Sequence, residues 1–402
     1  MSQAKATVTI IGAVGLYLAT TAVSFGAFKW LGTGPGEEFT SPLITSEGGL
    51  AIDPGEPKDQ ECPINGAKFT KTERKAWEEK RPVVVMVENH PDARPQSGLS
   101  RADVVYEAVA EGGITRFMGV WYCGAQAQDG KIAPVRSARM YFVNLAQEYN
   151  TPIYVHVGGG NCSRDEGTEE CTSHKKAWAL EELVKIGWRR RGGNDFDTIG
   201  DIGAPVLMRD QNRLGPERQL AVEHTMVGFL GNIWKEAAKR GFTNKNKDGS
   251  AWLDDFDQWS FTDDVKEGNR GNIAKINFEF WDDYSDFAIE WQYDTASNSY
   301  KRMNEGEAQV DLETNQQLTA KNIIVQFVKE EGPLDGHKHM YYEVAGKGKM
   351  LVFNNGQATE GTWEKAGPES RTKFKDSKGK DIKLVGGQTW IELVPVGQQV
   401  VY

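Results

Sequence analysis

The sequence lacks several patterns that would assign a function at once, and each absence excludes a class of protein. Its 402 residues contain 57 acidic and 47 basic side chains, for a formal net charge of -10. General nucleic-acid binders usually have a basic excess, so we expect no nucleic-acid partner. Ser97 and Ser137 lie in no nucleophile-elbow pattern, which argues against a serine hydrolase. The glycines at 158–160 match neither a phosphate-binding nor a dinucleotide-binding loop, and we predict no cofactor.

Cysteine is also scarce, with four residues in the chain. Cys162 and Cys171 lie close enough in sequence to close a short loop as a disulfide, and Cys62 and Cys123 would then pair across a longer interval. Four cysteines allow three pairings, and the sequence does not choose among them. Free thiols are one alternative. A zinc site is another, although its spacing would not be a standard zinc pattern, with ligands drawn from Cys162, Cys171, His156 and His174.

The N-terminal segment predicts a membrane anchor. Residues 6–28 contain no charged side chain, and as a helix they would span about 34 Å, enough for a bilayer core. No cysteine follows that could be lipidated. The alternative is a cleaved signal peptide, for which Ser24 and Gly26 form a poor cleavage site. We expect an uncleaved anchor over residues 1–31 and the rest of the chain outside the cell membrane.

The remaining length predicts more than one folded domain. Residues 32–60 have the composition of a flexible tether, residues 61–270 indicate an α/β domain with a mixed sheet, and residues 271–402 indicate a mainly antiparallel β domain, so the fold class is α+β. The periodicity predicts helices at 72–80, 137–148, 174–186 and 223–240. It predicts strands at 82–87, 114–122, 153–157, 273–280, 287–293, 323–328, 340–344, 350–353 and 389–394. Residues 104–109 fit either a strand or a helix.

Residues 81–142 combine strand-like runs with dense polar side chains, and we interpret this stretch as the functional face. The acid-base candidates are Glu88, His90, Asp103 and Glu107. Arg136, Ser137 and Arg139 lie at a predicted helix start, where free N–H groups and two guanidiniums would bind an anion. The full set of candidate ligand-binding residues is Arg94, Ser97, Glu111, Arg116, Arg136, Ser137, Arg139, His156 and His224. The alternative is that these arginines pair with Glu88, Glu107 and Glu111 to hold the loops.

Histidine is the second scarce residue, with six in the chain. His90 and His156 each follow or end a predicted strand, and His224 lies at a predicted helix start. If the three converged in the fold, metal or acid-base chemistry would become credible. The sequence alone predicts no metal site.

Long motifs carry a family resemblance. Residues 88–117 (ENHPDARPQSGLSRADVVYEAVAEGGITRF) and 134–142 (PVRSARMYF) resemble the signature of the YerB-like bacterial lipoprotein family. The similarity runs from about residue 81 to the C-terminus and includes 293–311 (YDTASNSYKRMNEGEAQVD). The resemblance implies a two-domain envelope protein facing away from the cytoplasm, and it implies no activity. The missing N-terminal cysteine and the segment 162–171 depart from the family pattern.

Three functional hypotheses follow. The first is a membrane-tethered envelope protein that binds an anionic ligand, either wall glycan or a phosphorylated polymer precursor, through the arginine cluster. The second is a phosphotransferase or hydrolase acting on the same ligand. The third is a structural or adaptor protein whose polar stretch is an internal salt-bridge lattice and whose β domain binds a protein partner.

Overall fold

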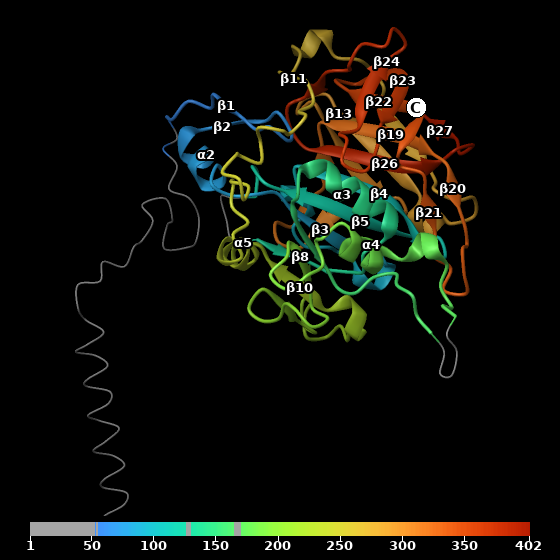
Figure 1. The fold of residues 1–402 in the computed structure, drawn as a ribbon. Helices are drawn as coiled ribbons and strands as arrows, with labels where there is room; N and C mark the ends of the chain where they lie inside the picture. The colour runs from blue at the N-terminus through green and yellow to red at the C-terminus, as the bar shows by residue number, and fades with distance from the viewer. Residues whose placement is uncertain (1–52, 54, 126–129, 165–169) are drawn as a thin grey trace, which may run out of the picture. The chain divides into compact units, whose positions relative to one another are not determined.

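The computed structural model describes residues 53, 55–125, 130–164 and 170–402 (Figure 1). The predicted membrane anchor and most of the predicted tether lie outside these residues. Among the helices of the described residues, none is both long and apolar enough to cross a bilayer. The expectation of a membrane helix at residues 1–31 therefore stays a prediction.

A mixed sheet of ten strands forms the centre of the described chain. In spatial order it contains β24 (Lys373–Asp376), β23 (Gln357–Lys365), β22 (Gly346–Asn354), β19 (Asn322–Val328), β26 (Thr389–Pro395), β4 (Val104–Glu111), β5 (Ile114–Trp121), β3 (Val83–Glu88), β7 (Ile153–His156) and β8 (Asp195–Asp197). Strands β26 and β4 pair in parallel, with Trp390 opposite Val105. The sheet thus takes strands from both sides of residue 270, where we predict a domain boundary.

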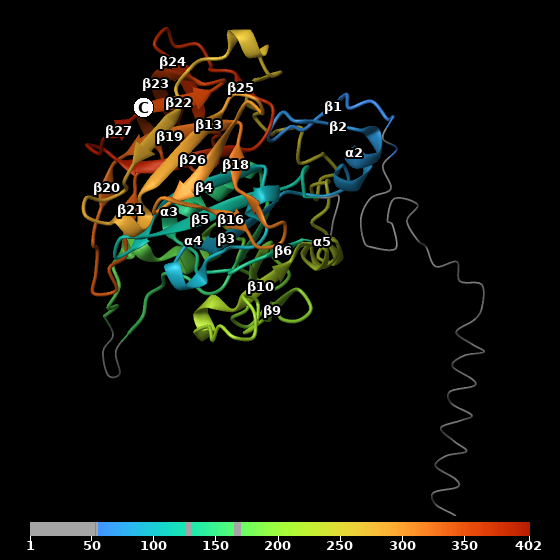
Figure 2. The same ribbon diagram turned by 180° about the vertical axis from the view of Figure 1, so that it is seen from behind.

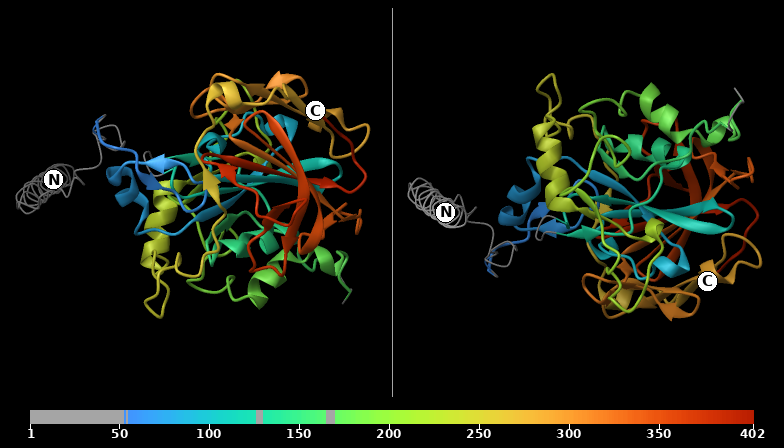
Figure 3. Two further views of the ribbon diagram at one scale, coloured as in Figure 1. Left: turned by 90° about the horizontal axis from the view of Figure 1, so that it is seen from above. Right: turned by 90° about the horizontal axis from the view of Figure 1, so that it is seen from below.

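A second, antiparallel sheet packs on one face of the large sheet. Its strands are β15 (Glu307–Ala308), β14 (Ser299–Asn304), β13 (Ile289–Asp294), β12 (Lys275–Phe278) and β27 (Val400–Val401), and β18 (Thr319–Ala320) pairs with β14. Helices α3 (Met140–Ala146) and α4 (Ala179–Lys185) cover the opposite face, as the views from behind and from above show (Figures 2 and 3). Side chains of β3 are buried throughout, because this strand is covered on both faces.

The remaining elements are short. The helices are α2 (Lys71–Trp77), α5 (Leu230–Lys239) and the 3-10 turns η1 (Pro91–Ala93), η2 (Leu99–Arg101), η3 (Gln147–Tyr149), η4 (Lys175–Ala177), η5 (Val222–His224), η6 (Glu267–Asn269) and η7 (Ser285–Phe287). The strands are β1 (Gln60–Glu61), β2 (Lys68–Phe69), β6 (Lys131–Ile132), β9 (Leu207–Arg209), β10 (Met226–Phe229), β11 (Phe261–Thr262), β16 (Val310–Asp311), β17 (Gln316–Gln317), β20 (Glu330–Glu331), β21 (Tyr341–Tyr342) and β25 (Leu384–Val385).

The mixed α+β class and most of the predicted strands agree with the structure, whereas three predicted helices begin later than expected. The helix predicted over 137–148 begins at Met140, and the one predicted over 174–186 begins at Ala179, after the 3-10 turn η4. The helix predicted over 223–240 begins only at Leu230, because Met226–Phe229 instead forms β10, which pairs with β6 and β9. The apolar residues of this segment fit both the helix and the strand periodicity, and pairing with β6 and β9 makes it a strand. The ambiguous segment 104–109 is strand β4 for the same reason.

Both disulfides proposed from the sequence are present. Cys62 bonds to Cys123, and Cys162 bonds to Cys171. The first joins the segment before α2 to the segment after β5. These pairings exclude a zinc site that uses the thiolates of Cys162 and Cys171, because a disulfide sulfur is not a thiolate ligand.

Candidate functional site

The large sheet divides the polar stretch into two clusters, because successive residues of a strand face opposite sides. Glu88 contacts Arg136 and His224, whereas the next residue, Asn89, contacts Glu107 on the other side. We call the first group, Glu88, His90, Asp92, Arg136 and His224, the Glu88 corner. The second group lies between the two sheets, and we call it the Arg302 cluster: Asn89, Glu107, Thr115, Arg302 and Glu392.

At the Glu88 corner, one carboxylate holds two cationic or basic side chains. Glu88 ends β3 and its side chain is buried. Its Oε1 lies 3.0 Å from Arg136 Nε, an approach not aligned for a hydrogen bond, so the contact is an ion pair. Its Oε2 lies 2.8 Å from His224 Nδ1. The ring of His90 stacks on that of His224, with centroids 5.1 Å apart and planes 23° apart.

The hydrogen bonds define the free nitrogens of the two histidines. A carboxylate only accepts, so His224 Nδ1 donates to Glu88 and leaves Nε2 with a lone pair when the ring is neutral. His90 Nδ1 accepts a bond of 3.2 Å from the backbone N–H of Asp92. The corner therefore presents a buttressed imidazole beside a second imidazole. That pair is able to move a proton or bind a metal ion.

Arg136 differs from Arg94, Arg116 and Arg139 because both of its terminal nitrogens lack a partner among the described residues. Its backbone N–H donates to Met86 of β3, which places the side chain beside Glu88. The side chain is 25% exposed, and beyond the contact with Glu88 its guanidinium has no hydrogen-bond partner within the described part of the chain. Burial lowers the pKa of Arg136, and the neighbouring Arg116 adds to that effect, but an arginine stays protonated at neutral pH.

Arg116 and Arg139 are committed to a single carboxylate, that of Glu111. Arg116 Nη2 lies 2.7 Å from Glu111 Oε1, and Arg139 Nη2 lies 2.6 Å from Oε2. Burial acts to raise the pKa of Glu111, but the two guanidiniums outweigh it and hold the pKa below its usual range. The helix predicted to begin at Ser137 begins at Met140, with Arg139 as its N-cap. The carbonyl of Ser137 accepts from Arg116.

Arg94 and Ser97 lie away from the Glu88 corner. Arg94 donates to the side chain of Asn89 at 3.1 Å and pairs with Glu305 at 2.7 Å. Ser97 Oγ donates to Glu313 at 2.9 Å. The structure therefore brings Glu88, His90, Arg136 and His224 together, and it does not gather the four predicted arginines around one pocket.

The Arg302 cluster contains the candidate base Glu107, and no water-accessible surface reaches it. Arg302 forms ion pairs with Glu107 and Glu392, and all three side chains are 0% exposed. Thr115 and Asn89 donate to Glu107, and the guanidinium of Arg302 lies 4.5 Å from the ring of Trp390. Burial raises the pKa of Glu392 well above its usual range, against the effect of Arg302. Sequence reasoning missed Arg302, although Tyr300, Arg302 and Asn304 alternate along one buried face of β14.

Asp103 and His156 are both buried among fixed partners. Asp103 accepts from the backbone N–H groups of Tyr122 and Cys123 and from Asn65, and burial raises its pKa to about 7. His156 Nε2 lies 2.5 Å from Asp195. Burial alone would lower the pKa of His156, but Asp195 outweighs burial and raises it. His156 thus does not join His90 and His224.

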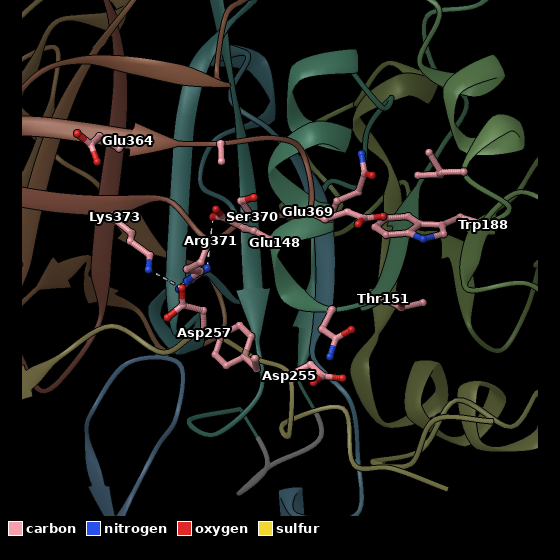
Figure 4. A pocket seen from close by; sticks show the side chains of 15 residues that line it. Glu148, Thr151, Trp188, Asp255, Asp257, Glu364, Glu369, Ser370, Arg371 and Lys373 are labelled. Atoms are coloured by element: carbon pink, nitrogen blue, oxygen red, sulfur yellow. Dashed lines mark hydrogen bonds and ion pairs between the residues drawn. The ribbon is translucent and has the colours of Figure 1, made fainter. Parts of the chain in front are cut away.

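A cavity of about 710 Å³ lies elsewhere, and no sequence motif pointed to it. Figure 4 shows polar side chains from distant segments converging on it, with Asp257 paired to Lys373 at 3.0 Å. Its lining residues include Glu148, Thr151, Trp188, Asp255, Glu369 and Arg371. Because these residues come from four separate parts of the chain, no local pattern exists that would reveal them.

Comparison with known proteins finds matches along most of the chain. Residues 69–242 match a family described as the N-terminal domain of a protein of unknown function (DUF3048), and residues 276–391 match its C-terminal domain. The chain is 30% identical over 344 residues to the putative lipoprotein YerB of Bacillus subtilis, covering 85% of this chain and 88% of that protein. It is also similar to the crystal structure of the Bacillus subtilis YerB protein, with a TM-score of 0.63 and 25% identity over 85% of this chain and all of that one.

Proposed function

This chain belongs to the YerB-like family of two-domain proteins of unknown function, and from that premise we propose that it binds an anionic group of a cell-envelope ligand at Arg136. The proposal narrows the expected four-arginine site to one guanidinium in the Glu88 corner. The observation that carries it is that Arg136 alone among those four arginines keeps terminal nitrogens without a partner in the described residues.

The other three arginines support the assignment of the anion to Arg136, because they already have partners within the protein. Arg116 and Arg139 share Glu111, and Arg94 holds Asn89 and Glu305, so an anion would have to displace an existing carboxylate partner to reach them. At Arg136 the Nε faces Glu88, and the two Nη groups are left for a ligand. A guanidinium offers two parallel N–H donors to a carboxylate or phosphate. His224 contacts the same carboxylate, and the ring of His90 stacks on that of His224.

The location proposed for the protein is the outer side of the cell membrane. The Bacillus subtilis relative is called a putative lipoprotein, and we infer that this chain is likewise held at the membrane, through residues 1–31 rather than through a lipid. Wall glycan and phosphorylated polymer precursors are the anionic ligands that fit such a place. A protein partner for the C-terminal β strands stays a prediction.

Substitution of Arg136 tests the proposal. Titration of the detergent-solubilised full chain with a sugar phosphate, with the unphosphorylated sugar as reference, measures the contribution of the anion. Loss of a charged hydrogen bond should weaken binding of the phosphate by about tenfold or more in Arg136→Gln. Arg191→Gln removes an exposed arginine elsewhere and should leave binding unchanged. Equal binding by wild type and Arg136→Gln would contradict the proposal.

A second candidate function is an enzyme acting on the same ligand. The observation that favours it is the His224–Glu88 contact, in which a carboxylate orients an imidazole for proton transfer. Release of phosphate from a phosphorylated precursor would be the readout. His224→Gln should abolish turnover and keep most of the binding, whereas a pure binding protein shows no turnover in either form.

A further inference from the structure

Three side chains of the Glu88 corner have the donor types and spacing of a metal site. His90, Asp92 and His224 each offer one ligand atom, and these atoms lie within 4.8 Å of one another. They come from the segment after β3 and from η5, which the fold brings together. We propose that His90, Asp92 and His224 bind one divalent transition-metal ion of the zinc class.

The distance between two of the ligand atoms matches a single ion. His90 Nδ1 lies 3.7 Å from Asp92 Oδ2. Two atoms that coordinate one tetrahedral zinc ion at about 2.1 Å lie about 3.4 Å apart. The lone pair of His90 Nδ1 is occupied only by a 3.2 Å hydrogen bond from the N–H of Asp92, which an ion would replace at little cost.

His224 has the second partner that metal-binding histidines usually have. Its Nδ1 lies 2.8 Å from the buried carboxylate of Glu88. A histidine that donates one ring N–H to a carboxylate has a defined tautomer and orientation, and its other nitrogen is a stronger ligand. Glu88 is itself paired with Arg136, and this ion pair fixes the position of the carboxylate that orients His224.

Two arginines fasten the segments that carry the ligands. Arg213 donates from Nε to the carbonyl of His224 at 2.8 Å and also to the carbonyl of Ala93. Arg218 donates from Nη2 to the carbonyl of Asp92 at 2.9 Å. The bonds from Arg213 cross-link the two segments at the backbone, so the segments that carry the ligands are held together before an ion arrives, and the side chains turn to coordinate it.

The carboxylates of Glu88, Asp92 and Glu223 balance the three arginines near the site, Arg136, Arg213 and Arg218, and the ligand set leaves one coordination position open. Asp92 has a side chain that is 76% exposed and is able to turn toward an ion, and the nearby Glu223 adds negative charge that acts on both histidines and on Arg136. Three protein ligands leave a fourth position for water or an anion. This inference deepens the proposed function, because an anion at that position would lie beside Arg136, but metal binding itself does not depend on it.

Zinc titration of the full-length protein, stripped of metal and of any affinity tag, tests the inference. We expect one zinc per chain in competition with a chromophoric chelator. His90→Ala and His224→Gln should each weaken the zinc affinity at least about tenfold. Glu88→Gln should do the same, because it removes the carboxylate that orients His224. The control is His337→Ala, which removes an exposed histidine whose ring lies 5.7 Å from that of His339; this variant should bind zinc as wild type does.

Thermal unfolding without metal shows whether each variant is folded, and cobalt absorption in place of zinc reports nitrogen ligands directly. Absence of stoichiometric binding, or equal affinity in wild type and in folded His90→Ala and His224→Gln, would overturn the metal site. Repeating the sugar-phosphate titration with a chelator separates the two ideas. Anion binding that persists there and still needs Arg136 leaves the proposed function standing without the metal.

Discussion

A single charged residue has a role that depends on its partner, and Arg302 shows this most clearly. Its neighbour on β14, Lys301, has a 43% exposed side chain paired with Asp294. Arg302 points the other way, into the space between the two sheets, where it pairs with Glu107 and Glu392. Glu107 therefore contributes to the packing of two sheets, where the sequence made it a candidate base.

Removing Arg302 should destabilise the protein strongly. Arg302→Met would leave the buried side chains of Glu107 and Glu392 without a cation, and a buried ion pair that loses one partner costs about 3–5 kcal/mol. Urea unfolding followed by tryptophan fluorescence measures the change. Lys301→Met removes a charge from the adjacent exposed position and should cost less than about 1 kcal/mol. Similar unfolding midpoints for the two variants would refute the role given to Arg302.

At the scale of elements, local sequence signals were sufficient to predict a helix where neighbouring residues provide the hydrogen-bond partners of its first turn. Helix α2 begins after Thr70, whose side chain accepts from the N–H of Glu73, while the Glu73 carboxylate accepts from the N–H of Thr70. This reciprocal cap satisfies two N–H groups that would otherwise be unpaired. Strand β10 has no such local signal, and only its pairing with β6 and β9 separates it from α5.

The N-cap of α2 leads to a prediction about stability. Thr70→Ala should cost about 1 kcal/mol of stability, because the N–H of Glu73 loses its acceptor. Lys71→Ala, one residue further along and exposed, should change stability by less than about 0.5 kcal/mol. Chemical unfolding of both variants compares them, and amide exchange of residues 71–77 locates the effect. A Thr70→Ala protein as stable as wild type would show that the cap is dispensable.

At the scale of the whole molecule, one buried glutamate ties together segments from both halves of the sequence. Glu148, in η3, receives hydrogen bonds from Tyr106 of β4 and from the backbone N–H of Thr372. It also forms ion pairs with Lys365, at 3.2 Å, and Arg371, at 3.3 Å. Burial acts to raise the pKa of Glu148, but the two cations outweigh it and the pKa is lowered.

The lowered pKa sets the direction of a pH effect. Because the folded pKa of Glu148 lies below its unfolded value of about 4.3, its stabilising effect is complete above that pH and is lost as the pH falls toward the folded pKa. Glu148→Gln should cost about 3–5 kcal/mol near neutral pH, and less below about pH 4. Unfolding at several pH values checks this. Glu364→Gln, which has a 45% exposed side chain paired with Lys375, is the control and should show a small difference at every pH.

The sequence by itself determined the family, the α+β class, most strands of the large sheet and the position of the polar stretch, because motifs and side-chain periodicity are local properties. It also brought His90 and His224 under consideration, although 134 residues separate them in the numbering. It overlooked β14, whose polar residues hide the alternation of buried Tyr300, Arg302 and Asn304.

The tertiary structure alone decided which polar residues remain free. Glu107 and Arg302 are 195 residues apart and meet between two sheets, while Glu88 and His224, 136 residues apart, meet at the end of β3. A strand's alternation says which residues share a face, but the layer that covers this face is set by long-range pairing. For that reason Arg116 and Arg139 became internal supports, whereas the terminal nitrogens of Arg136 have no partner in the described part of the chain.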